Sequence, residues 1–125
     1  MASNLYIRTG TARIEIARIA KSCKNKRFLS QFFSADEIRF FVKSKLNPAL
    51  IAENYCVKMA FAKAIGTGMR MIHAQDISVL RDRLGSPFVI TEGYAKMLEE
   101  REGFVINISV AHCKEYAVAS VVLNK

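Results

Sequence analysis

Residues 54–68 read NYCVKMAFAKAIGTG, an apolar stretch that ends in a Gly-Thr-Gly sequence. Alanine recurs through its first half, and alanine favours helix because it loses no side-chain entropy there. Gly66 follows the last apolar residue and can take the left-handed conformation that ends many helices. Upstream, Asn47 can cap the first free N–H groups, and Pro48 is tolerated in the first turn. The sequence therefore predicts one long, mostly buried helix over residues 48–65 that runs into a Gly-Thr-Gly turn.

The other segments predict shorter elements around this helix. Ser34 followed by Glu37 is typical of a capping box, and it predicts a helix that ends near Ser44. Residues 12–28 combine strand-like and helix-like spacing, which leaves both alternatives open, and residues 28–33 form an apolar cluster. Strands are expected at residues 5–8, 74–81, 87–91, 104–110 and 116–123, with a turn at 9–11 and a short helix at 94–102.

These elements indicate an α+β fold in a single domain that spans residues 1–125. The last two expected strands are rich in β-branched residues and are separated by a short turn, so we expect them to pair antiparallel. The expected architecture is a small antiparallel sheet packed against the long helix.

The charge balance points to an anionic partner. The chain has 19 basic and 11 acidic residues, a formal net charge of +8. Such an excess suits nucleic acid, a membrane surface, an acidic protein or a phosphorylated small molecule, and it also fits a merely solvated basic surface. The most basic segment, residues 13–27, lacks interleaved aromatic residues, so we expect no nucleic acid.

Two further compositional features bear on where the protein works. No run of about 18 apolar residues occurs and the N-terminus lacks the apolar core of a signal peptide, so we expect no membrane span and a cytoplasmic protein. Cys23, Cys56 and Cys113 are widely spaced and odd in number, which predicts free thiols.

The central stretch resembles the signature of the holo-acyl-carrier-protein synthases, the small 4′-phosphopantetheinyl transferases, whose helix reads (W/F)-x-x-K-E-A-x-x-K-A-x-G-T-G. The positions that match in register are Lys58, Ala60, Lys63, Ala64, Gly66, Thr67 and Gly68. Four more blocks follow the family pattern in the right order. They contain Gly10 and Ile14; Phe28, Phe33, Ser34 and Glu37; Gly85 and Pro87; and Ser109, His112, Tyr116 and Ala117. The resemblance therefore covers nearly the whole chain.

This resemblance implies a 4′-phosphopantetheinyl-transferase-like fold and a homotrimer with coenzyme A bound in clefts between subunits. There Mg²⁺ helps to move phosphopantetheine from coenzyme A onto a serine of an acidic acyl carrier protein. It implies catalytic roles for Lys63 and His112. The residues that it implies for binding coenzyme A or phosphopantetheine are Lys63, Gly66, Thr67, Gly68, Pro87 and His112. Carrier-protein contacts fall on Arg18, Lys24 and Arg27.

The metal site departs from the family pattern. The family's two carboxylate ligands, an Asp and a Glu, correspond here to Ala12 and Met59. Mg²⁺ requires oxygen ligands, so we expect no Mg²⁺ at the usual site and no metal ligand among the site residues. Asn54 and Ala111 also replace the family's usual Arg and Ser.

Two functional hypotheses follow from this departure. In the first, the chain binds acyl carrier protein and possesses impaired or no Mg²⁺-dependent transfer. In the second, it is an active transferase whose metal is held by water, by coenzyme A phosphates or by another carboxylate such as Glu15. A third interpretation treats Ala12 and Met59 as engineered replacements, in which case restoring both carboxylates would restore activity.

Simpler roles remain open for the individual residues. Lys63 could extend from an apolar helix to solvent. His112 could bond to backbone in a turn, and Arg18, Lys24 and Arg27 could form a solvated basic face.

Overall fold

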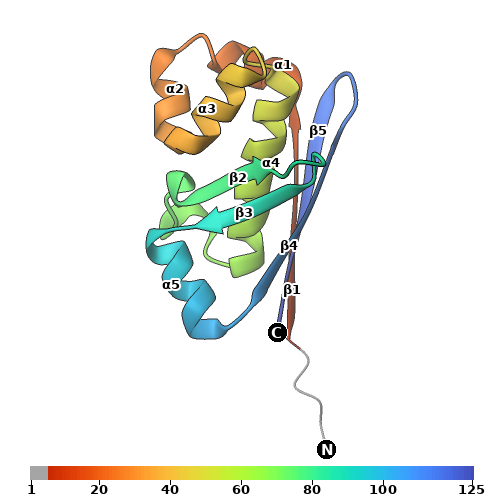
Figure 1. Ribbon diagram of the computed structural model, residues 1–125. Coiled ribbons are helices and arrows are strands. Elements are labelled where there is room, and N and C mark those ends of the chain that lie inside the picture. Colours follow the sequence, from red (N-terminus) through yellow and green to blue (C-terminus); the bar gives the residue numbers. More distant parts are fainter. Residues whose placement is uncertain (1–5) are drawn as a thin grey trace, which may run out of the picture.

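A three-stranded antiparallel sheet forms one side of the molecule, as the computed structural model shows for residues 6–125 (Figure 1). Its strand order is β1-β5-β4, with β1 at Ile7–Glu15, β5 at Tyr116–Asn124 and β4 at Val105–His112. The expected pairing of the last two strands is confirmed, and β1 pairs along its whole length with β5. The predicted opening strand included Leu5, which lies outside the described residues.

The long helix α4, Pro48–Ile65, packs against one face of this sheet (Figure 1). Its predicted ends are confirmed, because the Asn47 side chain accepts from the Ala49 N–H and Gly66 adopts a left-handed φ of 94°. The architecture is α+β, with the sheet and helix that the sequence predicts. In the part of the chain that the structure describes, no helix covers the opposite face of the sheet, which we call the outer face.

Gly10 permits the close approach of β1 to α4. A Cβ atom added at Gly10 would lie 2.0 Å from the carbonyl oxygen of Ala60 and 2.8 Å from the amide nitrogen of Ala64. The predicted turn at residues 9–11 is therefore wrong, because this glycine serves a close backbone contact within a continuous strand.

A second hairpin lies across α4 and forms a separate two-stranded sheet (Figure 1). Its strands are β2 at Ile77–Arg81 and β3 at Pro87–Thr91. Two short 3₁₀ helices precede it, η1 at Gly68–Arg70 and η2 at Ala74–Asp76. The strand predicted over residues 74–81 therefore begins three residues later than expected, at Ile77, because residues 74–76 form η2.

Residues 6–125 also form four further helices. They are α1 at Ile16–Ser22, α2 at Lys26–Phe32, α3 at Ala35–Lys43 and α5 at Gly93–Glu102. The ambiguous segment is a strand up to Glu15 and a helix from Ile16, and the apolar cluster at residues 28–33 falls mainly in α2. The capping box is confirmed, because Ser34 and Glu37 each accept from the other's backbone N–H.

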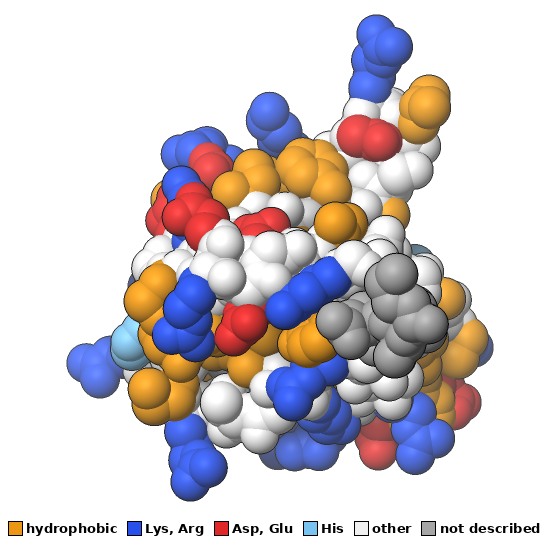
Figure 2. Space-filling view, turned by 90° about the horizontal axis from the view of Figure 1, so that it is seen from below, with side chains coloured by type: hydrophobic (Ala, Val, Ile, Leu, Met, Phe, Trp, Pro, Cys, Tyr) orange, Lys and Arg blue, Asp and Glu red, His pale blue; other side chains and the backbone are white. Residues whose placement is uncertain are grey.

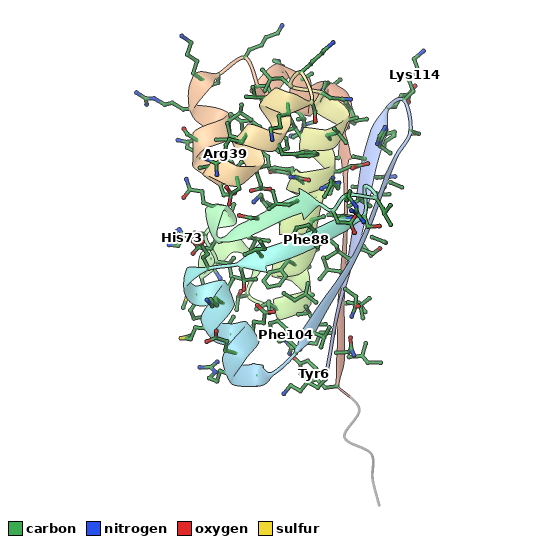
Figure 3. All side chains as sticks on the ribbon, in the orientation of Figure 1. Tyr6, Arg39, His73, Phe88, Phe104 and Lys114 are labelled. Carbon is green, nitrogen blue, oxygen red and sulfur yellow. The ribbon has the colours of Figure 1, made fainter. Side chains whose placement is uncertain are left out.

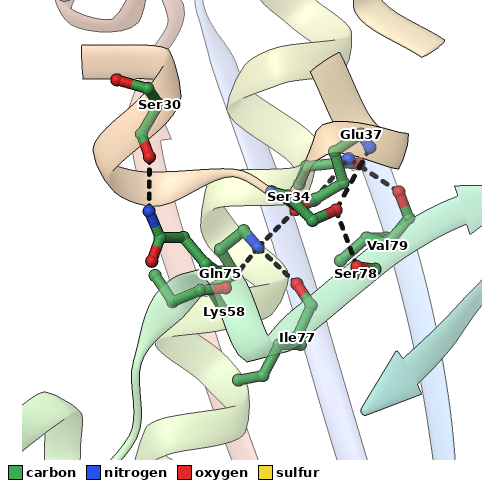
Figure 4. Close-up of polar contacts among 10 residues, drawn as sticks. Ser30, Ser34, Glu37, Lys58, Gln75, Ile77, Ser78 and Val79 are labelled. Carbon is green, nitrogen blue, oxygen red and sulfur yellow. Dashed lines mark hydrogen bonds and ion pairs between the residues drawn. The ribbon is translucent and has the colours of Figure 1, made fainter. Parts of the chain in front are cut away.

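Glu37 also joins a buried ion pair at the centre of the protein (Figure 4). Lys58 Nζ lies 2.7 Å from Glu37 Oε1 and donates to the backbone oxygens of Ala74 and Ile77. Burial raises the pKa of Glu37 and lowers the pKa of Lys58, and the ion pair opposes both shifts. The network fastens α3 and the loop before β2 to α4, so this lysine is structural.

The surface is less apolar than the core. Seen from below, Lys and Arg side chains project around the face that Figure 2 presents, with hydrophobic side chains between them. Among the helices of residues 6–125, none is long and apolar enough to cross a membrane.

Candidate functional site

Lys63 lies in the last turn of α4, at the edge of the sheet. Its Nζ donates to the carbonyl oxygen of Thr11 on β1 at 2.9 Å, while the side chain remains exposed. Ala12 is the next residue on β1, and Met59 lies one helical turn before Lys63 on α4. The structure thus gathers the predicted phosphate-binding lysine and both positions of the family's metal ligands at the contact between β1 and α4.

The residues at this contact do not fit a magnesium ion. A methyl group and a thioether sulfur offer none of the oxygen ligands that Mg²⁺ prefers. Within the described residues, no group of three or more His, Cys, Asp and Glu side chains could hold a metal ion. Glu15 is exposed on the opposite face of β1 from Ala12, about 10 Å further along the strand. It is therefore poorly placed to replace a missing ligand.

A surface groove of about 420 Å³ adjoins Lys63. Its lining comes from β1, β5 and Lys63, and the residues are Thr11, Ala12, Arg13, Lys63, Val118, Ala119 and Ser120. Two of these side chains are cationic and none is acidic. The Arg13 guanidinium lies over the Tyr116 ring, 5.3 Å from its centroid, on the same side of the sheet. The groove therefore presents positive charge to an anionic ligand.

The Gly66-Thr67-Gly68 turn follows Lys63 directly. Gly66 ends α4, and the Thr67 hydroxyl donates to the Gly68 carbonyl oxygen at 3.0 Å. Within residues 6–125, the backbone N–H groups of Thr67 and Gly68 donate no hydrogen bond, so both are available to an anion. Arg8 donates to the Ile65 carbonyl oxygen at 2.5 Å and adds a second cation beside the turn.

His112 ends β4, next to the β4–β5 hairpin whose tip Lys114 marks in Figure 3. His112 Nδ1 lies 2.6 Å from Oε2 of the buried Glu53, whose Oε1 accepts from Arg81 at 2.9 Å. Pro87 pairs with Arg81 in the β2–β3 register. His112 therefore contacts a carboxylate on α4 directly, and Arg81 holds the other oxygen of that carboxylate.

Cys113 does not cooperate with this histidine. His112 points toward α4, whereas Cys113 is exposed beyond the end of β4. A smaller cavity of about 250 Å³ lies beside the β4–β5 hairpin. It is lined by Ala111, His112, Cys113, Tyr116 and Val118.

The two groups of site residues are separated within one chain. Glu53, which contacts His112, precedes Lys63 by ten residues on α4, a rise of about 15 Å. The structure thus brings Lys63 together with the glycine turn, and it links His112 to Glu53 and Arg81. It does not bring Lys63 and His112 together.

The predicted carrier-protein residues lie on a third surface. Arg18 on α1, Lys24 in the following turn and Arg27 on α2 are all exposed. Among the described residues, none of the three forms an ion pair. Their charges are therefore free to attract an acidic partner.

Sequence reasoning missed Arg8, Glu53 and Arg81. Each makes its contact with a residue at least 28 positions away, so no local pattern reports it. One signal was available for Glu53, because a lone acidic residue within an apolar helix needs a cationic partner once it is buried.

Comparisons with known proteins show which family this chain belongs to. The family model of the 4′-phosphopantetheinyl transferase superfamily matches residues 14–121. A holo-(acyl-carrier-protein) synthase from Clostridium perfringens is 37% identical over 125 residues, covering 95% of this chain and 94% of its own length. One from Pelagibacter ubique is 37% identical over 121 residues, covering 93% and 94%.

Solved structures extend the likeness to three dimensions. A holo-(acyl-carrier-protein) synthase from Neisseria meningitidis superimposes with a TM-score of 0.87 at 25% identity, covering 94% of this chain and 98% of its own. The Bacillus anthracis enzyme, in complex with CoA (3′,5′-ADP), gives a TM-score of 0.79 at 29% identity, covering 97% and 98%. The chain belongs to the 4′-phosphopantetheinyl transferase superfamily, with holo-acyl-carrier-protein synthases as its relatives.

Proposed function

We propose that this protein binds an acidic acyl carrier protein and coenzyme A or a phosphopantetheine arm, with Mg²⁺-dependent phosphopantetheinyl transfer impaired or lost. One observation supports the impairment or loss of Mg²⁺-dependent transfer. The two positions where the family holds its metal are Ala12 and Met59, and both adjoin Lys63. Transfer of a phosphoryl group develops negative charge that a metal ion normally stabilises, so its loss lowers the rate by orders of magnitude.

Binding of coenzyme A is supported by what surrounds the lost metal site. The Bacillus anthracis relative was solved in complex with CoA. In this chain Lys63 lines a groove without acidic side chains, and the N–H groups of Thr67 and Gly68, a few residues further along the chain, are available. These groups suit phosphate oxygens through hydrogen bonds and positive charge.

Binding of a carrier protein is supported by the relatives' activity and by charge. The relatives act on acyl carrier protein, as their name states. Arg18, Lys24 and Arg27 are exposed and without ion pairs among the described residues, on a chain of net charge +8. Such charges steer an acidic partner and make its association sensitive to salt.

A homotrimer is the assembly that we propose for this function. Glu53, which holds His112, and Lys63 are about 15 Å apart along α4, so a trimer would allow one site to combine Lys63 of one copy with His112 of its neighbour. The outer face of the sheet exposes Val105 and Val118, which are 56% and 40% exposed, and leaves apolar surface for such contacts.

The alternative is an active transferase with a rearranged metal site. The retention of Lys63, His112 and the glycine turn favours it. Glu15 weighs against it, because this carboxylate is exposed on the other face of β1 and lines a different cavity. The binding function is therefore our conclusion.

A titration of the protein with apo and holo acyl carrier protein tests the binding function. We expect binding that weakens as salt increases, and that weakens about tenfold in the triple variant Arg18→Gln, Lys24→Gln, Arg27→Gln. A matched control is Arg83→Gln in the exposed turn between β2 and β3, which should bind normally. Absence of binding to both carrier forms, or equal binding by the triple variant, would contradict the proposed carrier surface.

A further inference from the structure

The loss of both metal ligands has an electrostatic consequence for the ligand site. Two carboxylates and one Mg²⁺ contribute no net charge, and an alanine, a methionine and no metal also contribute none. The Lys63 ammonium is present in either case. A diphosphate therefore meets the same net charge at this site, whereas a single remaining carboxylate would repel it. The paired replacement is thus compatible with anion binding.

The described residues supply the charge that an anion needs without a metal. Lys63 Nζ is anchored by Thr11 at 2.9 Å and remains exposed, so it can donate further hydrogens to a ligand. Arg8 is held beside Gly66 by its bond to the Ile65 carbonyl oxygen. Arg13 lines the groove, which has no acidic lining residue.

We propose that this site binds the diphosphate of coenzyme A without a divalent cation, with the Lys63 ammonium and the residue 66–68 turn as its principal contacts. The inference rests on the proposed binding of coenzyme A and specifies how that binding is achieved. With Ala12 and Met59, the site would then bind coenzyme A without needing a metal ion, and its affinity for coenzyme A would be retained.

Calorimetric titration of the full chain with coenzyme A, in EDTA and then in Mg²⁺, tests this directly. We expect the dissociation constants for coenzyme A in EDTA and in Mg²⁺ to agree within about threefold, because the protein offers no side-chain ligand for Mg²⁺ at this site. We expect Lys63→Gln to weaken binding about tenfold or more in EDTA, since a charge-assisted contact is lost. Lys43→Gln, an exposed lysine on α3 outside the groove, is the matched control and should bind as the unaltered chain does.

The double variant Ala12→Asp, Met59→Glu gives the converse result. It should bind coenzyme A about tenfold or more weakly in EDTA, because two unneutralised carboxylates face the phosphates, and Mg²⁺ should restore the affinity. Circular dichroism of each variant confirms that it is folded. The unaltered protein and Lys63→Gln decide the question even where the double variant does not fold.

Each outcome bears on the inference. Mg²⁺-independent binding that depends on Lys63 supports it. Binding by the unaltered chain only when Mg²⁺ is present overturns it and leaves the proposed binding of coenzyme A intact. Absence of binding in both conditions overturns the inference together with the coenzyme A part of the proposed function, while carrier-protein binding is decided by its own titration.

Discussion

The Nδ1 atom of His112 lies 2.6 Å from the Oε2 atom of Glu53 and joins the end of β4 to α4. In the neutral imidazole, donation from Nδ1 to this carboxylate leaves Nε2 as the acceptor. Arg81 holds the other oxygen of Glu53 at 2.9 Å. Glu53 thus fixes the orientation of a histidine that the family resemblance places in the active site.

Replacing Glu53 by Gln should destabilise the fold. Arg81 and Glu53 are only 10% and 7% exposed, so the change leaves a largely buried guanidinium without its counter-charge. We expect the free energy of unfolding to fall by about 3 kcal/mol, as measured by urea denaturation. The exposed pair Arg39–Asp36 provides the control, and Asp36→Asn should cost about 1 kcal/mol or less. Equal losses in the two variants would contradict a structural role for Glu53.

The Glu37–Lys58 pair should show strong coupling in a double-mutant cycle. Both side chains are completely buried, so Lys58→Met leaves an unpaired carboxylate and should cost about 3–5 kcal/mol. Adding Glu37→Gln should recover part of this loss, because the buried charge is then gone. Additive losses, again from urea denaturation, would show that the two side chains do not depend on each other.

The cysteines should differ in reactivity with pH. Burial, assisted by the charge of Glu53, raises the pKa of Cys56 to about 11. Hydrogen bonds from the backbone of Glu115 and Tyr116 lower the pKa of the exposed Cys113 thiol. The thiolate is the reactive form, so Cys113 should reach its full alkylation rate at a lower pH than an ordinary thiol.

Mass spectrometry after brief iodoacetamide treatment at a series of pH values measures the labelling of each cysteine as a function of pH. We expect label on Cys113 first and none on Cys56 until the protein is unfolded. Early labelling of Cys56 would show that the contact between α4 and the sheet opens readily.

The sequence predicted those parts of the fold that short-range chemistry determines. Asn47, Pro48 and Gly66 marked both ends of α4, and Ser34 with Glu37 marked the start of α3. The sequence did not predict the full length of β1, because a glycine at position 10 suggests a turn. Glycine is needed there because the strand passes close to the backbone of Ala60, 50 residues later in the chain. The pairing of β1 with β5 likewise joins segments about 100 residues apart.

The candidate site divides in the same way. Lys63 and the residue 66–68 turn are neighbours in the sequence, so their association could be predicted. The connection from His112 to Glu53 and Arg81 joins three elements across the fold, and no local pattern contains it. That the two groups lie apart in one chain could be seen only in the structure.

Transfer of phosphopantetheine onto a carrier protein shows whether this chain has lost the metal-dependent activity of its relatives. Incubate apo acyl carrier protein with coenzyme A, Mg²⁺ and a catalytic amount of this protein, and weigh the carrier by mass spectrometry beside a parallel reaction with the Clostridium perfringens relative. We expect a mass gain in the parallel reaction and none with this chain over the same time, because Ala12 and Met59 cannot hold the metal. Full conversion of the carrier by this chain, gaining the mass of one phosphopantetheine arm, would contradict it.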